Sequence, residues 1–256
     1  MANSDSWQKI FDDYHILEHD FSSSYFPLSA EQIKRSCQDF KKTAEKEVRI
    51  LCKQDTRESR PRIFQQHDLF ILPTKNGQYA ICKGEGYIDI PPIVSEVQIY
   101  NSKLDFHLDS SDVGNSEMQH LDFAYASSLI RTFMGDPTLL LTIRGRKYTP
   151  KFSFKVDGIQ IEAESVQTEV DAGYEGKDKI VLIEAKNAAV ENTIIRQLFY
   201  PYRQWQSITE KKVIPVFFER DALQDLYNIW QYEFSDANNY NSIQLVKSGR
   251  YKILGV

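Results

Sequence analysis

The sequence predicts an α+β protein with a mixed β-sheet, because of the order in which helical and strand-like segments follow one another. Helical spacing dominates the first sixty residues, and strand-like runs dominate from Pro61 onwards. Between residues 116 and 218 a helix, several strands able to pair with their neighbours, a second helix and a further strand succeed each other. Strands grouped together, rather than alternating strictly with helices, are typical of α+β domains.

The N-terminal part is expected to be helical. Ser29 and Gln32 have the spacing of a capping box, in which each side chain bonds the other residue's backbone N–H, so a helix should begin there and run through Phe40. An earlier helix is marked by apolar residues at helical spacing: Trp7, Ile10, Phe11 and Tyr14.

A β-hairpin is predicted after this helical part. The runs 69–73 and 79–84 flank Asn76 and Gly77, a pair that is typical of a tight hairpin turn. Residues 93–100 have the composition of one more strand.

The second half of the chain is expected to supply the main sheet. Helices are predicted from Ser116, over about 190–207 and over 223–234, and two short strands should end the chain. Asp157 and Gly158 mark a hairpin turn. Strands are predicted at 139–145, 151–156, 159–172, 179–186 and 213–218.

Composition indicates an ordinary globular protein. Hydrophobic residues make up 41% of the chain and charged residues 26%, and no apolar run approaches the roughly 20 residues of a membrane span. The three cysteines are widely spaced and odd in number, which favours reduced thiols over a disulfide frame or a zinc site. The polar N-terminus is unlike a secretory signal, so we expect a cytoplasmic protein.

The charge is unevenly distributed. The net charge of −5 argues against indiscriminate binding to polyanions. Residues 31–62, however, carry ten Lys or Arg against six Asp or Glu, and residues 142–151 carry four cations and no acid. An acidic total therefore does not exclude a local basic surface that faces phosphates.

Asp171, Glu184 and Lys186 are the most informative residues of the chain. They lie near the ends of two consecutive strand-like runs, and Glu184 and Lys186 share a face because they are two apart. If the two strands pair as a hairpin, Asp171 can meet Glu184. Two close carboxylates repel each other unless a cation lies between them, and oxygen ligands suit Mg²⁺. A lysine beside them can orient water for metal-assisted phosphodiester hydrolysis.

This pattern resembles the PD-(D/E)XK nuclease superfamily, and within it the type II restriction endonucleases. The core resemblance covers roughly residues 117–218, and segments within 60–87 and 116–147 extend it over most of 45–220. It implies a restriction-endonuclease-like core of helix, three-strand meander, helix and strand. An N-terminal helical and β-hairpin accessory region would precede this core.

The resemblance assigns roles to four residues. Asp171 matches the metal-binding acid, Glu184 the second acid and Lys186 the catalytic lysine, and the main-chain carbonyl of Ala185 is a further expected ligand of Mg²⁺. The sequence departs from the motif at Val170, where the family has a proline that supplies no ligand. The alternatives are an exposed cross-strand pair for Glu184 and Lys186, and a turn residue for Asp171.

Three other residues are candidates for the same site. Glu169 shares a strand face with Asp171, although a solvated strand face explains it equally well. Gln197 resembles a glutamine that relatives place after the lysine strand. Glu117 occupies a place where some members of the superfamily have another acid, although an acid at a helix N-terminus is also favoured by the helix dipole.

Several cations are candidates for DNA contacts. Arg144, Arg146 and Lys147 suit phosphate or guanine contacts, but charges that protect an exposed edge strand are an equal explanation. Arg196 and Arg203 could clamp phosphates or form surface ion pairs. The arginines of the run RESRPR are a further suggestion: Arg57, Arg60 and Arg62.

The resemblance therefore implies a Mg²⁺-dependent type II restriction endonuclease that cleaves double-stranded DNA at a specific sequence and leaves 5′-phosphate ends. Residues 1–110 would form the accessory and DNA-recognition region, and residues 111–256 the catalytic domain. A homodimer and a cognate DNA methyltransferase as genetic partner are also implied, and no membrane. The alternatives are a structure-specific repair or recombination nuclease and a catalytically inactive DNA-binding regulator.

Overall fold

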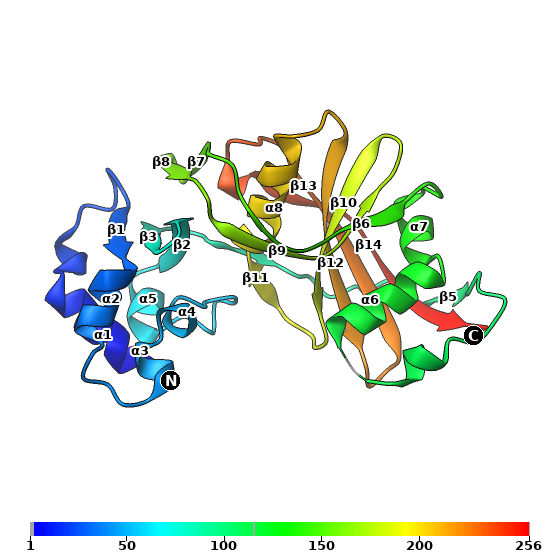
Figure 1. Ribbon diagram of the computed structural model, residues 1–256, viewed down its shortest axis with the longest axis horizontal. Coiled ribbons are helices and arrows are strands. Elements are labelled where there is room, and N and C mark those ends of the chain that lie inside the picture. The colour runs from blue at the N-terminus through cyan, green and yellow to red at the C-terminus, as the bar shows by residue number, and fades with distance from the viewer. Residues whose placement is uncertain (1–2, 115, 256) are drawn as a thin grey trace.

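The computed structural model describes residues 3–114 and 116–255, and within these ranges the chain is a mixed α+β protein. A seven-stranded mixed sheet forms the centre of its larger part, and smaller sheets and helices surround it. Figure 1 shows the N-terminal helices at one end of the long axis and the large sheet with its covering helices at the other. None of the helices in the described ranges is long and apolar enough to cross a membrane.

The N-terminal unit, residues 3–83, packs short helices against a three-stranded sheet of order β1-β3-β2. The expected capping box is confirmed, because Ser29 and Gln32 bond each other's backbone N–H. Trp7 and Phe64 stack edge to face, with ring centroids 4.7 Å apart, in the core of this unit. Its elements are α1 (Ser4–Asp13), η1 (Ile16–Glu18), β1 (Phe26–Ser29), α2 (Ala30–Ser36), α3 (Thr43–Lys46), α4 (Val48–Leu51), α5 (Arg62–Gln66), β2 (Leu69–Lys75) and β3 (Gln78–Lys83).

The large sheet has the order β5-β14-β13-β12-β10-β9-β6. Parallel pairing joins β10 to β12 and β14 to β5, and the remaining neighbours are antiparallel, so the prediction of a mixed sheet is confirmed. The strands are β5 (Gln98–Asn101), β6 (Leu140–Tyr148), β9 (Gln167–Glu175), β10 (Lys179–Lys186), β12 (Lys212–Asp221), β13 (Leu226–Phe234) and β14 (Ile243–Leu254).

Helices cover both faces of this sheet. On one face α6 (Glu117–Ala126) and α7 (Leu129–Met134) share a core with Val181 and Ile183 of β10. On the other, α8 (Arg196–Gln206) shares a core with Leu182. A strand between two layers must be apolar on both faces, which is why the run from 179 to 186 shows no alternation until its end.

Two small strand pairs flank the sheet. The predicted hairpin turn at Asp157 and Gly158, both with positive φ, joins β7 (Phe152–Val156) to β8 (Ile159–Ala163). The other pair joins β4 (Tyr87–Asp89) to β11 (Asn192–Ile194), which directly precedes α8. The remaining helical turns are η2 (Asp109–Asp112) and η3 (Tyr240–Ser242).

The helix predicted over 223–234 is wrong, because this segment is β13. Almost all of its residues are buried between the layers, so it lacks the alternation that marks a strand with one exposed face. The two short strands predicted at the C-terminus are a single strand, β14. The helix predicted from Ser116 breaks into two at Ser128, whose φ of 70° is not helical.

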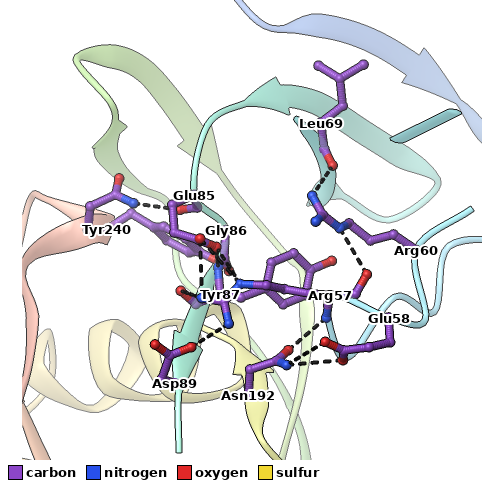
Figure 2. A network of polar contacts seen from close by, with 11 residues as sticks. Arg57, Glu58, Arg60, Leu69, Glu85, Gly86, Tyr87, Asp89, Asn192 and Tyr240 are labelled. Carbon is purple, nitrogen blue, oxygen red and sulfur yellow. Dashed lines mark hydrogen bonds and ion pairs between the residues drawn. The ribbon is translucent and has the colours of Figure 1, made fainter. Parts of the chain in front are cut away.

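Polar contacts hold the N-terminal unit against the larger part of the chain, as Figure 2 shows. Arg57 Nη1 donates to Asp89 of β4 at 2.5 Å, and the Arg57 backbone N–H donates to Asn192 Oδ1 at 2.7 Å. Asn192 in turn donates to Glu58 at 3.0 Å. Arg60 donates to the Leu69 carbonyl oxygen at 3.1 Å. Arg57 and Arg60, suggested as DNA contacts, thus bind within the protein.

Candidate active site

The strands bring Asp171, Glu184 and Lys186 together. Asp171 lies on β9, and Glu184 and Lys186 lie on the last residues of its antiparallel neighbour β10. The side chain of Glu184 is 11% exposed and that of Lys186 is 24% exposed. Lys186 Nζ donates to Glu184 Oε1 at 2.5 Å, so the pair lies partly buried rather than at an open sheet edge.

Asp171 lies where the two strands separate. Pairing of β9 with β10 ends at Ala172 and Ile183. Beyond this point the Ala185 backbone N–H donates to Asp171 Oδ2 at 2.8 Å. The carboxylate therefore takes the place of a main-chain acceptor, and it is fixed beside the strand that carries Glu184.

Burial disfavours ionisation of both acids. It raises the pKa of Glu184 to about 7, although Lys186 opposes the shift, and repulsion from Asp171 adds to it. Burial also raises the pKa of Asp171, against the hydrogen bond from Ala185 and the charge of Lys186. For Lys186 burial lowers the pKa, but the attraction of Glu184 outweighs it, so the pKa is raised and the amine is a cation at neutral pH.

These residues fit a divalent cation. Burial raises the pKa of both partly buried carboxylates, so a cation between them would favour their charged forms, and their oxygens are the hard ligands that Mg²⁺ prefers. Within residues 3–114 and 116–255 no three His, Cys, Asp or Glu side chains are grouped for a metal. Two acids, a main-chain carbonyl and water oxygens would therefore make up the ligand set, which is usual for Mg²⁺.

A cleft of about 910 Å³ contains these three residues. One wall comes from the large sheet and α8, and the other from the N-terminal unit. The N-terminal wall is lined by two acids, Glu47 and Asp55, and by five exposed cations, which we call the cationic wall: Lys34, Lys46, Arg49, Lys53 and Lys75. The sequence did not single out these residues, although the local excess of cations in 31–62 was the signal for all of them except Lys75.

The three additional candidates also line this cleft. Glu117, the first residue of α6, is close enough to raise the pKa of Asp171. Glu169 pairs with Arg146 at 3.2 Å on the outer part of β9. Gln197 Oε1 accepts from the Thr193 hydroxyl at 2.6 Å, which orients its amide at the start of α8.

The basic run on β6 is held by neighbouring side chains. Arg144 forms an ion pair with Asp122 of α6, and Arg146 pairs with Glu169. Lys147 Nζ lies 6.0 Å from the centre of the Trp205 ring. None of the three lines the cleft that contains the acids. Their role in DNA binding stays a prediction.

The two arginines of α8 differ in their surroundings. Arg196 lines the cleft and lies 3.9 Å from Asp55. Arg203 donates to the Ser153 carbonyl oxygen at 3.2 Å and to the Ala237 carbonyl oxygen. Its guanidinium also lies 5.0 Å from the ring centre of Phe152, so Arg203 ties α8 to the β7–β8 hairpin.

Comparison with known proteins places the chain by family alone. Residues 82–252 match the family described as Domain of unknown function (DUF6997), and residues 4–81 match Domain of unknown function (DUF6996). No curated protein and no solved structure matches the chain.

Proposed function

We propose that this chain, which belongs to the DUF6997 family, is a Mg²⁺-dependent endonuclease that cleaves double-stranded DNA at specific sites, as type II restriction endonucleases do. One observation carries the proposal. Asp171, Glu184 and Lys186 meet at adjoining strand ends inside a cleft whose opposite wall is cationic. Acids for a metal and cations for phosphates are what hydrolysis of a nucleic acid requires.

The order and pairing of the elements support this proposal. Along the chain come helices α6 and α7, the strands β6, β9 and β10, helix α8 and strand β12, with the β7–β8 hairpin after β6 and the short strand β11 before α8. The three strands pair antiparallel in chain order, and β12 lies parallel to β10. This order of helix, antiparallel strands, helix and parallel strand is the one expected from the sequence resemblance, and it supports the proposal of a restriction-endonuclease-like core.

The proposed metal site uses Asp171, Glu184 and the main-chain carbonyl of Ala185. When bound, Mg²⁺ would offset the negative charge on the scissile phosphate and favour attack by water. Lys186 is protonated at neutral pH, so it donates a hydrogen bond that orients the attacking water rather than accepting its proton. The Ala185 N–H keeps Asp171 at the strand end. In-line attack at phosphorus would leave a 5′-phosphate and a 3′-hydroxyl.

The cationic wall and the site have separate tasks in this scheme. The wall and Arg196 neutralise backbone phosphates and hold the duplex in the cleft, with Gln197 and Glu117 as additional groups near the reacting atoms. A single site cuts one strand, so cleavage of both strands at a palindrome requires a homodimer. A DNA methyltransferase that protects the host site would be the genetic partner.

The direct test is incubation of the purified protein with unmethylated phage DNA, with Mg²⁺ or with EDTA. Discrete fragments that appear only with Mg²⁺ support a restriction endonuclease. Cleavage confined to branched or damaged DNA would instead favour a repair nuclease. Binding without cleavage of any substrate would refute the hydrolytic assignment and favour a regulator.

A further inference from the structure

A second cavity, of about 710 Å³, lies on the same sheet face as the candidate active site but is lined by other residues. Its floor consists of β12, β13 and β14, and its walls are the segments 89–93 and 189–192. Contacts shown in Figure 2 brace its rim, where Arg57 pairs with Asp89 and Glu58 accepts from Asn192. The cavity is therefore a built feature of the fold and not a gap between mobile loops.

The strand register lays a polar row across the floor of this cavity. Glu219 of β12 lies opposite Asn228 of β13, and Asn228 lies opposite Arg250 of β14. The row continues in the other direction to Lys186, the register partner of Glu219 on β10. One line of side chains on a single sheet face thus connects the candidate active site with the second cavity.

The row is buried, and part of its hydrogen-bonding capacity is unused. Glu219 is 5% exposed and Asn228 is 8% exposed, and Asn228 Nδ2 donates to Glu219 Oε1 at 2.9 Å. Among the described residues Asn228 Oδ1 and Arg250 Nε, both buried, have no hydrogen-bond partner. Unused buried acceptors and donors are costly unless a bound molecule satisfies them.

The remaining lining is mixed, with an apolar part beside six charged or polar residues: Arg57, Glu58, Asp89, Glu191, Asn192 and Asp221. Trp230 borders the floor, and its indole N–H donates to the Pro91 carbonyl oxygen at 2.9 Å, which fixes the ring against the wall. Pro92 and Val190 also line the cavity. A fixed aromatic ring and apolar side chains beside placed polar groups are typical of sites for small molecules.

We propose that this cavity binds a nucleobase that carries an exocyclic amino group. The amino group donates to the Glu219 carboxylate and to Asn228 Oδ1, a ring nitrogen or carbonyl oxygen accepts from Arg250 Nε, and the apolar part of the lining, with Trp230, Pro92 and Val190, holds the ring. Such a base can belong to a free nucleotide or to a nucleotide extruded from the proposed DNA substrate, and the latter source rests on the proposed function. Binding of an extruded base would place a site for base recognition beside the scissile bond.

Binding is tested with nucleoside monophosphates by calorimetry, which requires no cleavage activity. GMP, AMP and CMP should bind, and TMP, which has no exocyclic amine, should bind about tenfold more weakly or not at all. Glu219→Gln should weaken binding of the amino-bearing nucleotides by about tenfold or more. Equal affinity of TMP, or an unchanged affinity in Glu219→Gln, would overturn the proposal.

A second pair of variants tests the cavity through exposed residues, so that no buried residue of the row is substituted. Ala189 is exposed at the cavity rim, so Ala189→Trp should block the cavity without disturbing the core, whereas Ala188→Trp, on the same loop but outside the lining, should not. If both variants bind as the native protein does, the cavity is not the site. Thermal melts confirm that each variant is folded.

A DNA duplex that contains 2-aminopurine distinguishes the two sources of the base. The fluorescence of 2-aminopurine rises when this base is no longer stacked on its neighbours in the duplex. A rise that Ala189→Trp abolishes assigns an extruded base, and mononucleotide binding without any rise assigns a free nucleotide. Either result supports the nucleobase site. If neither mononucleotides nor the duplex occupy the cavity, the nucleobase site is refuted. The protein could still cleave DNA, so failure of the nucleobase site is distinct from failure of the proposed function.

Discussion

The Ala185 backbone N–H donates to Asp171 Oδ2 at 2.8 Å, one residue pair beyond the last backbone pairing between β9 and β10. Asp171 is thus both a structural acceptor and a candidate metal ligand. An amide side chain can keep the first task but not the second, because it accepts a hydrogen bond without carrying negative charge. The two tasks can therefore be separated by substitution.

Asp171→Asn should keep or slightly raise the free energy of unfolding, because burial disfavours the charged carboxylate, and it should abolish Mg²⁺-dependent cleavage. Asp171→Ala should abolish cleavage and also destabilise the fold by about 1–3 kcal/mol, because the Ala185 N–H loses its acceptor in a buried position. Urea unfolding and the phage DNA assay measure the two effects. Full cleavage by Asp171→Asn would exclude a metal ligand at this position.

Lys186→Ala should lower the cleavage rate by roughly a hundredfold or more, because the attacking water loses the group that orients it. Lys179→Ala is a matched control at the other end of β10. Lys179 pairs with Asp136, and the side-chain exposures of that pair, 26% and 11%, are close to the 24% and 11% of Lys186 and Glu184. Single-turnover cleavage rates compare the variants, and equal rates would remove Lys186 from the mechanism.

The stability of the metal-free protein should fall as the pH rises from about 4.5 to about 7. Burial raises the pKa of Glu184 from 4.5 to about 7, so the native state holds a proton that the unfolded chain has released. The protonated Glu184 contributes to the free energy of unfolding. This contribution is fully present below about pH 4.5 and is lost as the pH passes about 7. It amounts to about 3 kcal/mol.

The difference between native protein and Glu184→Gln isolates this contribution. In EDTA the variant should become the more stable of the two as the pH rises through the window, since it buries no carboxylate. Mg²⁺ added at pH 8 should stabilise the native protein and not the variant, because only the native site presents both charges. Parallel melting curves across the window would contradict the assignment of Glu184.

The sequence predicted β10 with its observed bounds and placed Asp171 on a strand, but the single strand predicted over 159–172 is two strands, β8 and β9, in different sheets. An apolar run that ends in Glu-x-Lys identified β10, because burial on both faces leaves charges only where the strand ends. Burial on both faces also explains why a helix was wrongly predicted at β13. It removed the alternation of apolar and polar residues that distinguishes a strand from a helix. Only pairing with β12 and β14, which is a long-range property, decides that segment.

The composition of the cleft could not be predicted residue by residue. It depends on how the N-terminal unit sits against the sheet, and this is determined by contacts between distant residues such as Arg57 and Asn192, which are 135 positions apart. The excess of cations in 31–62 was visible, but not which of them face the acids. Likewise, the row of Glu219, Asn228 and Arg250 depends on strand register.

Charge reversal on the cationic wall should weaken DNA binding without affecting the metal site. Lys34→Glu, Arg49→Glu and Lys53→Glu together remove three cations that line the cleft, so the dependence of log Kd on log salt should become shallower by about three. Mg²⁺-induced stabilisation should persist, because these residues are exposed on the opposite wall. Fluorescence anisotropy with a labelled duplex, in EDTA and over a salt series, measures the effect.

The control for this variant is Arg35→Glu, Lys41→Glu and Lys42→Glu together, which changes the net charge by the same amount at exposed residues of the same unit outside the cleft lining. Unfocused attraction between a folded protein and DNA would weaken in both variants alike, since it depends on net charge. A groove that grips the phosphates would be sensitive only to the cations inside it. An equal loss of affinity in the control and in the cleft variant would therefore show that the cleft does not bind DNA. The acids of β9 and β10 would then not act on a nucleic acid.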